Sequence, residues 1–272
     1  MRSSENILRI VTALIGIPVV IGAMWAGGGW FWLLIAAISL GGQYELYHMA
    51  RRRGYQPALM IGWALGIVVL LRWLDFPWYP VLLGGILVLI AYELIRSSAT
   101  PMANVGIGLL GLVYPVWMIS LLVDIRLMSS LPDPEAFYLT LLLFVLIWAT
   151  DTAAYYVGRT WGRHRLAPHI SPGKTWEGAV GGVAGALLTA GLLKYYFIHF
   201  LSLENMMVLA LIASILGPVG DLVESRFKRA VGVKDSGKLL PGHGGLLDRF
   251  DALLFAVPAD YIYLKYFVGI LG

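Results

Sequence analysis

The charged residues of this chain concentrate near its carboxyl end, in the stretch SRFKRAVGVKDSGKLLPGHGGLLDRFD at residues 225–251. Only 13% of the chain is charged, so six Lys and Arg residues here exceed what packing alone requires. Five glycines prevent a continuous helix and let backbone N–H groups approach a ligand. Basic side chains, glycine backbone and spaced carboxylates together suit a site for phosphate and a metal ion. A basic loop that only sets membrane topology is the simpler alternative.

Carboxylates stand near both ends of this stretch. Asp221 has the spacing that places it on one helical face with Glu224, Ser225 and Lys228. Asp248 begins the next apolar segment, on the other side of the glycine loop. Two such helix ends can converge on Mg²⁺, which usually takes one or two carboxylates together with substrate phosphates. Asp248 can also be explained as the N-cap of its helix.

A second basic loop, residues 159–178, reads RTWGRHRLAPHISPGKTWEG. Ser171, Lys174 and Thr175 could bind phosphate oxygens, although the glycine spacing of a Walker A loop is missing. A Ser-Pro turn is the simpler interpretation, with Glu177 capping the helix that follows. Asp151 lies near the end of the preceding apolar run, where an interhelical hydrogen bond and a functional carboxylate are both plausible.

Long apolar segments must position these groups. The chain has 272 residues, of which 59% are hydrophobic, and a mean hydropathy of +0.77, whereas a soluble domain is about 45–50% apolar. Cysteine is absent, which excludes disulfides and thiolate metal sites. A spanning helix needs about 20 mostly apolar residues. Nine segments meet this condition: 7–26, 30–50, 57–74, 78–95, 104–123, 136–158, 177–200, 205–228 and 249–270. We therefore expect an all-α polytopic membrane protein with an uncleaved first helix.

The distribution of positive charge predicts an orientation. With the N-terminus inside and nine spans, all but four of the 20 Lys and Arg residues fall in inside segments or their flanks. The exceptions are Arg72, Arg126, Lys194 and Lys265. This asymmetry is the one that membrane proteins show toward the cytoplasm. It predicts that the two basic loops face the cytoplasm and that the C-terminus lies outside.

Some features of the apolar segments have packing explanations. Glu45 and Glu93 lie within apolar runs, where a proton or metal ligand is one interpretation and a hydrogen-bonded interhelical contact is the preferred one. Asp260, deep in the last segment, is expected to be paired and has no assigned role. Small residues at four-residue spacing in 178–185 predict close contact with a neighbouring helix.

The stretch 225–251 resembles the signature of the phosphatidate cytidylyltransferase (CDP-diacylglycerol synthase) family. Its fixed positions are all met, at Ser225, Phe227, Lys228, Arg229, Lys234, Asp235, Gly237, Leu240, Pro241, His243, Gly244, Gly245, Leu246, Asp248, Arg249, Phe250 and Asp251. Family members are also similar around the second basic loop, at Asp151, Thr152, Ala154, Tyr155, Gly158, Arg159, Ser171, Pro172, Lys174, Thr175, Glu177 and Gly178. The resemblance covers residues 136–272, which we expect to be the catalytic region, with residues 1–135 as a transmembrane scaffold.

The resemblance implies that CTP and phosphatidate give CDP-diacylglycerol and pyrophosphate, at the cytoplasmic face of the inner membrane, in phospholipid biosynthesis. Nucleotidyl transfer requires positioning and charge neutralisation more than covalent catalysis. With the signature present, Asp221 and Asp248 are the predicted Mg²⁺ ligands. Further ligands, for this ion or a second cation, are expected among Asp151, Glu177 and Asp251.

The other polar residues of the two loops are expected to bind phosphates. The catalytic candidates besides the two metal ligands are Lys228, Arg229, His243 and Arg249. The substrate-binding candidates are Ser171, Lys174, Thr175, Ser225, Lys234, Lys238, Gly244 and Gly245. His243 could position or protonate a phosphate, or be structural. The expected partners are CTP, phosphatidate and membrane lipid, without nucleic acid, and a homodimer is left open.

There are two alternatives, of which the first is another enzyme and the second belongs to a different class. A CTP-dependent lipid kinase would use the γ-phosphate of the nucleotide and release CDP. An ion-coupled transporter would explain the carboxylates in apolar runs, but transporter sites usually lie near the membrane midplane, whereas the charges here cluster at one end of the segments.

Overall fold

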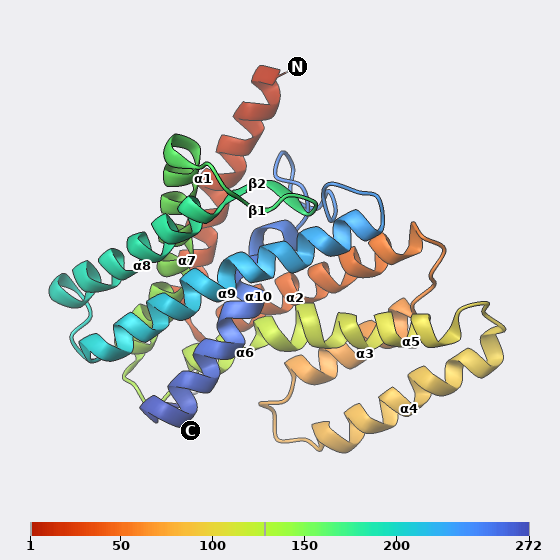
Figure 1. Ribbon diagram of the computed structural model, residues 1–272. Helices are drawn as coiled ribbons and strands as arrows, with labels where there is room; N and C mark the ends of the chain where they lie inside the picture. The colour runs from red at the N-terminus through yellow and green to blue at the C-terminus, as the bar shows by residue number, and fades with distance from the viewer. Residues whose placement is uncertain (1, 128, 272) are drawn as a thin grey trace.

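The computed structural model describes residues 2–127 and 129–271, and helices make up most of it (Figure 1). In chain order the helices are α1 (Arg2–Ala26), α2 (Gly28–Arg51), α3 (Leu59–Leu70), α4 (Trp78–Arg96), α5 (Pro101–Gly111), η1 (Leu112–Trp117), α6 (Met118–Leu127), α7 (Asp133–Trp161), α8 (Trp176–Tyr196), α9 (Leu203–Ala230), α10 (Leu247–Tyr263) and η2 (Leu264–Val268). Each of the nine expected segments is helical, with ends that differ by a few residues.

Five of the described helical segments are long and apolar enough to cross a membrane, judged by length and composition. These segments are Trp78–Arg96, Pro101–Leu127, Asp133–Trp161, Trp176–Tyr196 and Leu203–Ala230, and shorter apolar helices lie at Val11–Ala26 and Leu59–Leu70. The class of helical membrane protein is therefore confirmed, while the number of nine spans stays a prediction. The segment Pro101–Leu127 is continuous through the π-helical turn η1, which contains Pro115. A proline lacks the N–H of a regular helical turn, so a local change of helix type is expected there.

The helices that carry the signature residues pack tightly through small side chains. On α8, a Cβ at Gly178 would lie 2.8 Å from the carbonyl oxygen of Ala154, and one at Gly185 would lie 2.4 Å from the Cβ of Ala153. Both contacts are closer than real Cβ atoms allow, so only glycine permits this approach of α8 to α7. The predicted close packing of the segment 178–185 is confirmed.

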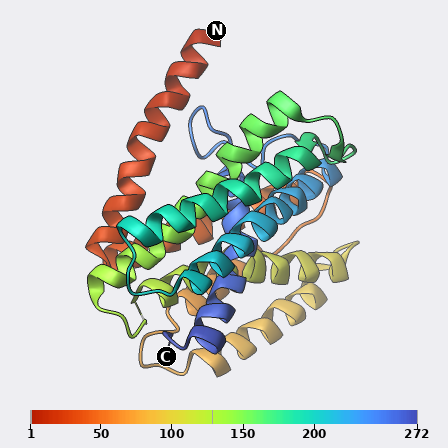
Figure 2. The ribbon, with the colours of Figure 1, turned by 60° about the vertical axis from the view of Figure 1, so that its left-hand side comes forward.

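The connecting segments gather at two ends of the helical body. At one end, Arg96 donates hydrogen bonds to the carbonyl and side-chain oxygens of Gln56, and Thr12 of α1 donates one to the carbonyl oxygen of Pro241. At the other end, Arg126 bonds to Met24 and Asp133. The basic loops thus share one end, as the charge alternation predicts, and the amino-terminal half of α1 extends from the body beside them (Figures 1 and 2).

The all-α expectation needs one correction, because the second basic loop contains a short sheet. β1 (Arg165–Ala167) pairs antiparallel with β2 (Ser171–Thr175), and Pro172, Gly173 and Lys174 lie within β2. The sequence indicated only a turn there, since two strands this short carry no periodic pattern. The hairpin holds Thr175 against Gly158 of α7 and Gly178 of α8, and it places Lys174 against α9.

One apolar core joins the two halves of the chain. It includes Phe31 and Ile35 of α2, Leu139 and Leu146 of α7, and Leu254 of α10, all nearly inaccessible to solvent. Residues 1–135 and 136–272 therefore pack against each other through a common interior.

Candidate active site

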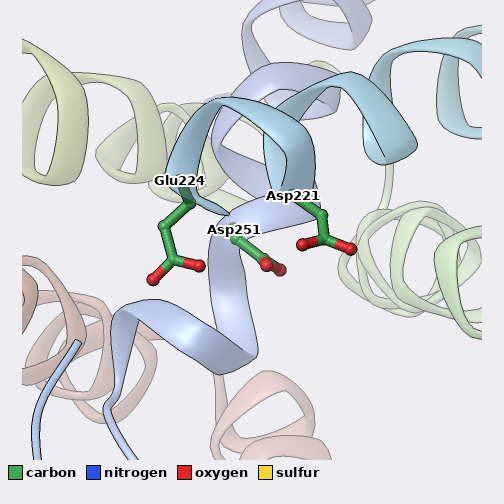
Figure 3. Close-up of side chains that lie close together, drawn as sticks. All are labelled: Asp221, Glu224 and Asp251. Carbon is green, nitrogen blue, oxygen red and sulfur yellow. The ribbon is translucent and has the colours of Figure 1, made fainter. Parts of the chain in front are cut away.

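Three carboxylates lie together where α9 crosses α10. Oxygen atoms of Asp221, Glu224 and Asp251 lie within 4.8 Å of one another. Figure 3 shows Asp251 of α10 between the two acidic side chains of α9. The close crossing requires Gly220, because a Cβ there would lie 2.4 Å from the carbonyl oxygen of Asp251. One residue without a side chain thus brings the two helices near enough for their carboxylates to meet.

This cluster has the chemistry of a divalent cation site. Glu224 is fully buried, and its Oε1 has no hydrogen-bond partner in the described part of the chain. An unpartnered buried carboxylate oxygen is costly, and a cation would compensate it. Oxygen ligands are those that Mg²⁺ prefers, and it commonly completes its shell with water and substrate phosphates. The residues present therefore fit the ion that the sequence led us to expect.

The cluster opens into a cavity of about 380 Å³ that is lined mainly by charged residues. Its lining consists of Asp151, Asp221, Ser225, Lys228, Arg229, Lys234, Asp235, Asp248, Arg249, Asp251 and Ala252. Acidic groups at one wall and basic groups around them can hold a metal ion and the phosphates bound to it. We name this space the acidic cavity.

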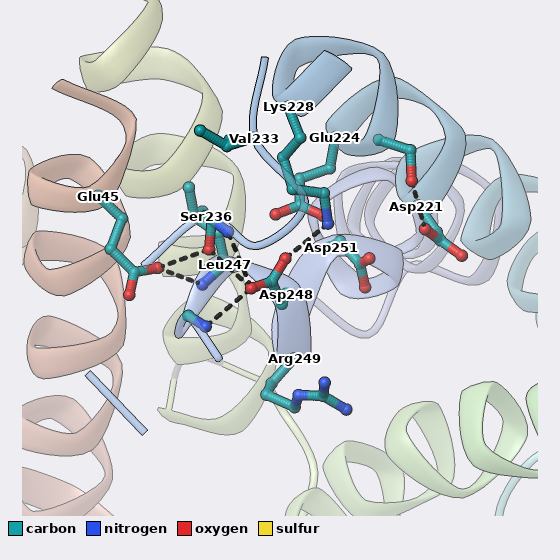
Figure 4. Close-up of polar contacts among 12 residues, drawn as sticks. Glu45, Asp221, Glu224, Lys228, Val233, Ser236, Leu247, Asp248, Arg249 and Asp251 are labelled. Atoms are coloured by element: carbon teal, nitrogen blue, oxygen red, sulfur yellow. Dashed lines mark hydrogen bonds and ion pairs between the residues drawn. The ribbon is translucent and has the colours of Figure 1, made fainter. Parts of the chain in front are cut away.

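Asp248 is held by groups other than the carboxylate cluster (Figure 4). Its Oδ1 lies 2.5 Å from the ammonium of Lys228, which also pairs with Glu224 at 2.5 Å. Its Oδ2 accepts hydrogen bonds from the backbone N–H groups of Gly245, at 2.7 Å, and Ser236, at 3.0 Å. Burial would raise the pKa of Asp248, but the ammonium and the two N–H groups outweigh burial and hold the pKa below its usual range. Asp248 thus fastens the glycine loop to α9.

Glu45 of α2 supports the same loop from the opposite side. Its Oε2 accepts a hydrogen bond from the backbone N–H of Leu247 at 2.9 Å and lies 2.9 Å from the hydroxyl of Ser236. A Cβ at Gly237 or Gly245 would lie within 2.6 Å of the Glu45 carboxylate, so both glycines are required for this contact. The preferred interpretation of Glu45 as a hydrogen-bonded contact is confirmed, although its partner is the functional loop.

The second basic loop reaches the site through one side chain. Lys174 forms an ion pair with Asp221 at 2.7 Å and donates a hydrogen bond to the carbonyl oxygen of Pro218 in α9. Thr175 is buried and caps α8, its hydroxyl accepting from the N–H of Gly178 at 3.1 Å. Ser171 is half-buried in β2 and does not line the acidic cavity.

The other predicted ligand in this region lies elsewhere. Glu177 pairs with His164 at 2.5 Å and accepts hydrogen bonds from the backbone N–H groups of Arg163 and His164. It is not part of the acidic cavity lining, whereas Asp151 is.

Several signature residues have backbone partners in the loop. Arg229 donates to the carbonyl oxygen of Val233, and Arg249 donates two hydrogen bonds to the carbonyl oxygen of His243. The carbonyl oxygen of Gly244 accepts from the N–H of Leu240, and Gly244 has a positive φ of 87° that favours glycine. These contacts give the loop a defined shape.

The structure groups the carboxylates differently from the pairing expected from the sequence. Asp221 lies with Glu224 and Asp251, while Asp248, which lines the same cavity, forms its ion pair with Lys228. Glu224 was recognised as sharing a helical face with Asp221 but was not proposed as a ligand. Its i, i+3 spacing from Asp221 was the available signal.

The comparisons with known proteins give one consistent result. A model described as the cytidylyltransferase family matches residues 7–267. A phosphatidate cytidylyltransferase of Brucella melitensis is 36% identical over 259 residues, covering 94% of this chain and 92% of the relative. Proteins of the same name from Synechocystis sp. and Staphylococcus saprophyticus are 34% and 33% identical, covering 97% and 92% of this chain and 98% and 96% of their own lengths. The similarity therefore extends beyond residues 136–272 into the amino-terminal half.

Proposed function

The chain belongs to the cytidylyltransferase family, and we propose that it makes CDP-diacylglycerol and pyrophosphate from CTP and phosphatidate. The observation that carries this proposal is the similarity over nearly the full length of relatives named phosphatidate cytidylyltransferase. The acidic cavity supports it, because carboxylates and cations are combined there at the end of a helical membrane protein.

The reaction joins the phosphate of phosphatidate to the α-phosphate of CTP and releases pyrophosphate. An oxygen of the phosphatidate phosphate attacks the α-phosphorus of CTP, and the bond from this phosphorus to the oxygen that bridges to the β-phosphate breaks. Pyrophosphate leaves with the bonding electrons. Negative charge grows on the leaving group, so fixed cations near it lower the barrier.

The carboxylates and the cations at the acidic cavity would have different roles in this reaction. Asp221, Glu224 and Asp251 would hold Mg²⁺, which supplies charge neutralisation to the triphosphate. Asp151 and Asp248 also line the cavity and can assist this ion or a second cation beside the substrate. Arg229 and Arg249 are exposed at the cavity and can bind phosphate oxygens, whereas Lys228 is buried and keeps Asp248 and Glu224 in place.

Our proposal includes the placement in the membrane. Nine spans with an inside N-terminus would put the basic loops and the acidic cavity at the cytoplasmic face of the inner membrane. Residues 1–135 would act mainly as scaffold and 136–272 as catalytic region, with the loop contact of Glu45 as a contribution from the first part. A homodimer is compatible with these assignments.

Product analysis tests the function. The purified protein in detergent is incubated with Mg²⁺, phosphatidate and CTP that carries label in either the α- or the γ-phosphate. We expect α-label in the lipid product and γ-label in pyrophosphate. Transfer of γ-label to lipid with release of CDP would identify a lipid kinase and refute the proposal. Solute flux in proteoliposomes without nucleotide, combined with no labelled product, would favour a transporter.

A further inference from the structure

A second cavity, of about 520 Å³, lies beside the acidic cavity and has a different charge. Its charged lining comprises Arg52 after α2, Lys234, Asp235 and Lys238, and the remainder is mainly the glycine loop between 232 and 244. We name this space the basic cavity. Lys234 and Asp235 line both cavities, so they form a common wall.

The cations of the basic cavity are available to a ligand, unlike several in the acidic cavity. In the acidic cavity, Lys228 is already paired with carboxylates, and Arg229 and Arg249 are bonded to carbonyl oxygens. Within residues 2–127 and 129–271, Arg52, Lys234 and Lys238 form no side-chain ion pair or hydrogen bond. Three exposed cations face this cavity, and none of them is paired with its one carboxylate, Asp235, in the part of the chain that the structure describes. Such an excess of unpaired positive charge favours an anionic ligand.

The basic cavity continues into a groove along α2, where the apolar groups of Tyr44 and Leu239 lie among polar residues that include Glu45. A third cavity, of about 360 Å³, shares Arg52, Gly237 and Lys238 with it and extends between Tyr44, His48 and Leu239. Tyr44 is 37% exposed and Leu239 is 48% exposed. Large exposed apolar groups next to unpaired cations suit a ligand with an anionic head and an apolar body.

We propose that the phosphate of the lipid substrate binds between Arg52, Lys234 and Lys238, with its glycerol and adjoining methylenes along Tyr44 and Leu239. This assignment rests on the proposed function, and it leaves the acidic cavity to the triphosphate and its metal ion. A phosphate monoester without a metal ion is repelled by the five aspartates that line the acidic cavity, whereas the lining of the basic cavity has one, Asp235. The common wall at Lys234 brings the attacking lipid oxygen toward the α-phosphorus of the nucleotide.

Arg52 provides the most selective test, because it lines the basic cavity and not the acidic one. In Arg52→Gln we expect the KM for phosphatidate to rise about tenfold or more, since a charge-assisted contact to phosphate is lost. The KM for CTP should change less than about twofold. Arg52→Lys should recover part of the affinity for phosphatidate. Arg51→Gln is the matched control, since the neighbouring Arg51 lines a different surface pocket, and it should leave both constants unchanged.

A binding measurement separates the possible sources of the phosphate. The full-length protein in detergent is titrated with labelled dioctanoyl phosphatidate in the absence of CTP, and inorganic phosphate and glycerol 3-phosphate are the competitors. We expect Arg52→Gln to weaken lipid binding about tenfold and the two competitors to displace lipid only weakly. Equal displacement by inorganic phosphate would show a general anion site and overturn the lipid assignment.

The proposed function and this assignment fail in different ways. A wild-type protein that makes no CDP-diacylglycerol refutes the function. An active wild type whose Arg52→Gln variant keeps its KM for phosphatidate, or changes only its KM for CTP, refutes this assignment alone.

Discussion

At the scale of single residues, the acidic groups of the site fall into two classes. Asp221, Glu224 and Asp251 face one another, and a bound cation would offset the repulsion among three carboxylates this close. Asp248 and Glu45 instead accept hydrogen bonds from the glycine loop. The first class is suited to binding a metal ion and the second to positioning the loop.

One Asp→Asn variant from each class tests whether the residue binds the metal ion or positions the loop. Asp251→Asn should raise the Mg²⁺ concentration for half-maximal activity about tenfold or more, with little loss of thermal stability, because it removes a ligand charge from the cluster. Asp248→Asn should lower stability by about 1.5–3 kcal/mol, the range for a hydrogen bond to a charged group, because Lys228 keeps its ion pair with Glu224. Its requirement for Mg²⁺ should change less. Mg²⁺ titrations and melting curves in detergent provide the two readouts, and the reverse pattern would restore Asp248 as a principal ligand.

Substitutions of Glu45 can show whether this residue acts through its hydrogen bond or through its charge. Its Oε2 accepts from the loop, while its Oε1 has no hydrogen-bond partner among the described residues. Glu45→Gln can keep the accepting oxygen, so we expect near-native activity. Glu45→Ala leaves the N–H of Leu247 unsatisfied, which costs about 1–3 kcal/mol, and should lower both stability and turnover. Loss of activity in Glu45→Gln with native stability would instead indicate a proton or metal role.

Lys174 lies next to Asp221, on the side of the hairpin, and we expect it to contact the triphosphate. Lys174→Ala should raise the KM for CTP about tenfold and leave the KM for phosphatidate nearly unchanged. Steady-state kinetics with each substrate varied in turn measure both constants. A selective effect on phosphatidate would place the lipid phosphate in the acidic cavity.

At the scale of elements, the crossing of α9 and α10 determines whether the acidic cluster forms. A Cβ at Gly220 would collide with the backbone of Asp251, which cannot yield without separating the helices. At Gly217, one turn earlier on α9, a Cβ would lie 3.0 Å from the terminal methyl of Ile147, which can adjust. The same mutation at the two positions therefore meets backbone in one case and a flexible side chain in the other.

The Gly220→Ala variant tests this crossing, with Gly217→Ala as its control. We expect Gly220→Ala to lose at least about 1–3 kcal/mol of stability, the usual cost of overpacking, and most of its activity. Gly217→Ala should retain both. Melting curves and turnover measured on the two variants decide the matter, and equal behaviour would mean that α9 and α10 tolerate a wider crossing.

At the scale of the whole molecule, the basic loops share one end, and the turn after α3, where Arg72 pairs with Asp124 of α6, lies at the other (Figure 1). Cysteine labelling can determine which end faces the cytoplasm, because the native chain has no cysteine. Ser236 of the glycine loop is 1% exposed and would not react from either side, so the labelled positions must be exposed ones. Pro172 and Asp75 are exposed and lie in loops at opposite predicted sides.

The expected labelling follows the charge asymmetry. In intact cells, a membrane-impermeant maleimide should label Asp75→Cys, while Pro172→Cys should react only after permeabilisation. Blocking with the same reagent before lysis provides the control for leakage. Labelling of Pro172→Cys from outside intact cells would reverse the proposed orientation.

The sequence by itself determined the helical membrane class, the nine helical segments and the residues from which the site is built. Those properties are local, since hydropathy and i, i+3 spacing depend on neighbours along the chain. The partners of each carboxylate were decided only by the tertiary structure, which brings Glu45 to Leu247 and Asp221 to Asp251. Hydropathy predicts how deep a residue lies in the membrane but not which side of its helix faces a neighbouring helix. The packing at Gly220 brings Asp221 to Asp251, and the packing at Gly245 brings Glu45 to the glycine loop, so only the tertiary structure distinguishes the acids of the metal cluster from those that support the loop.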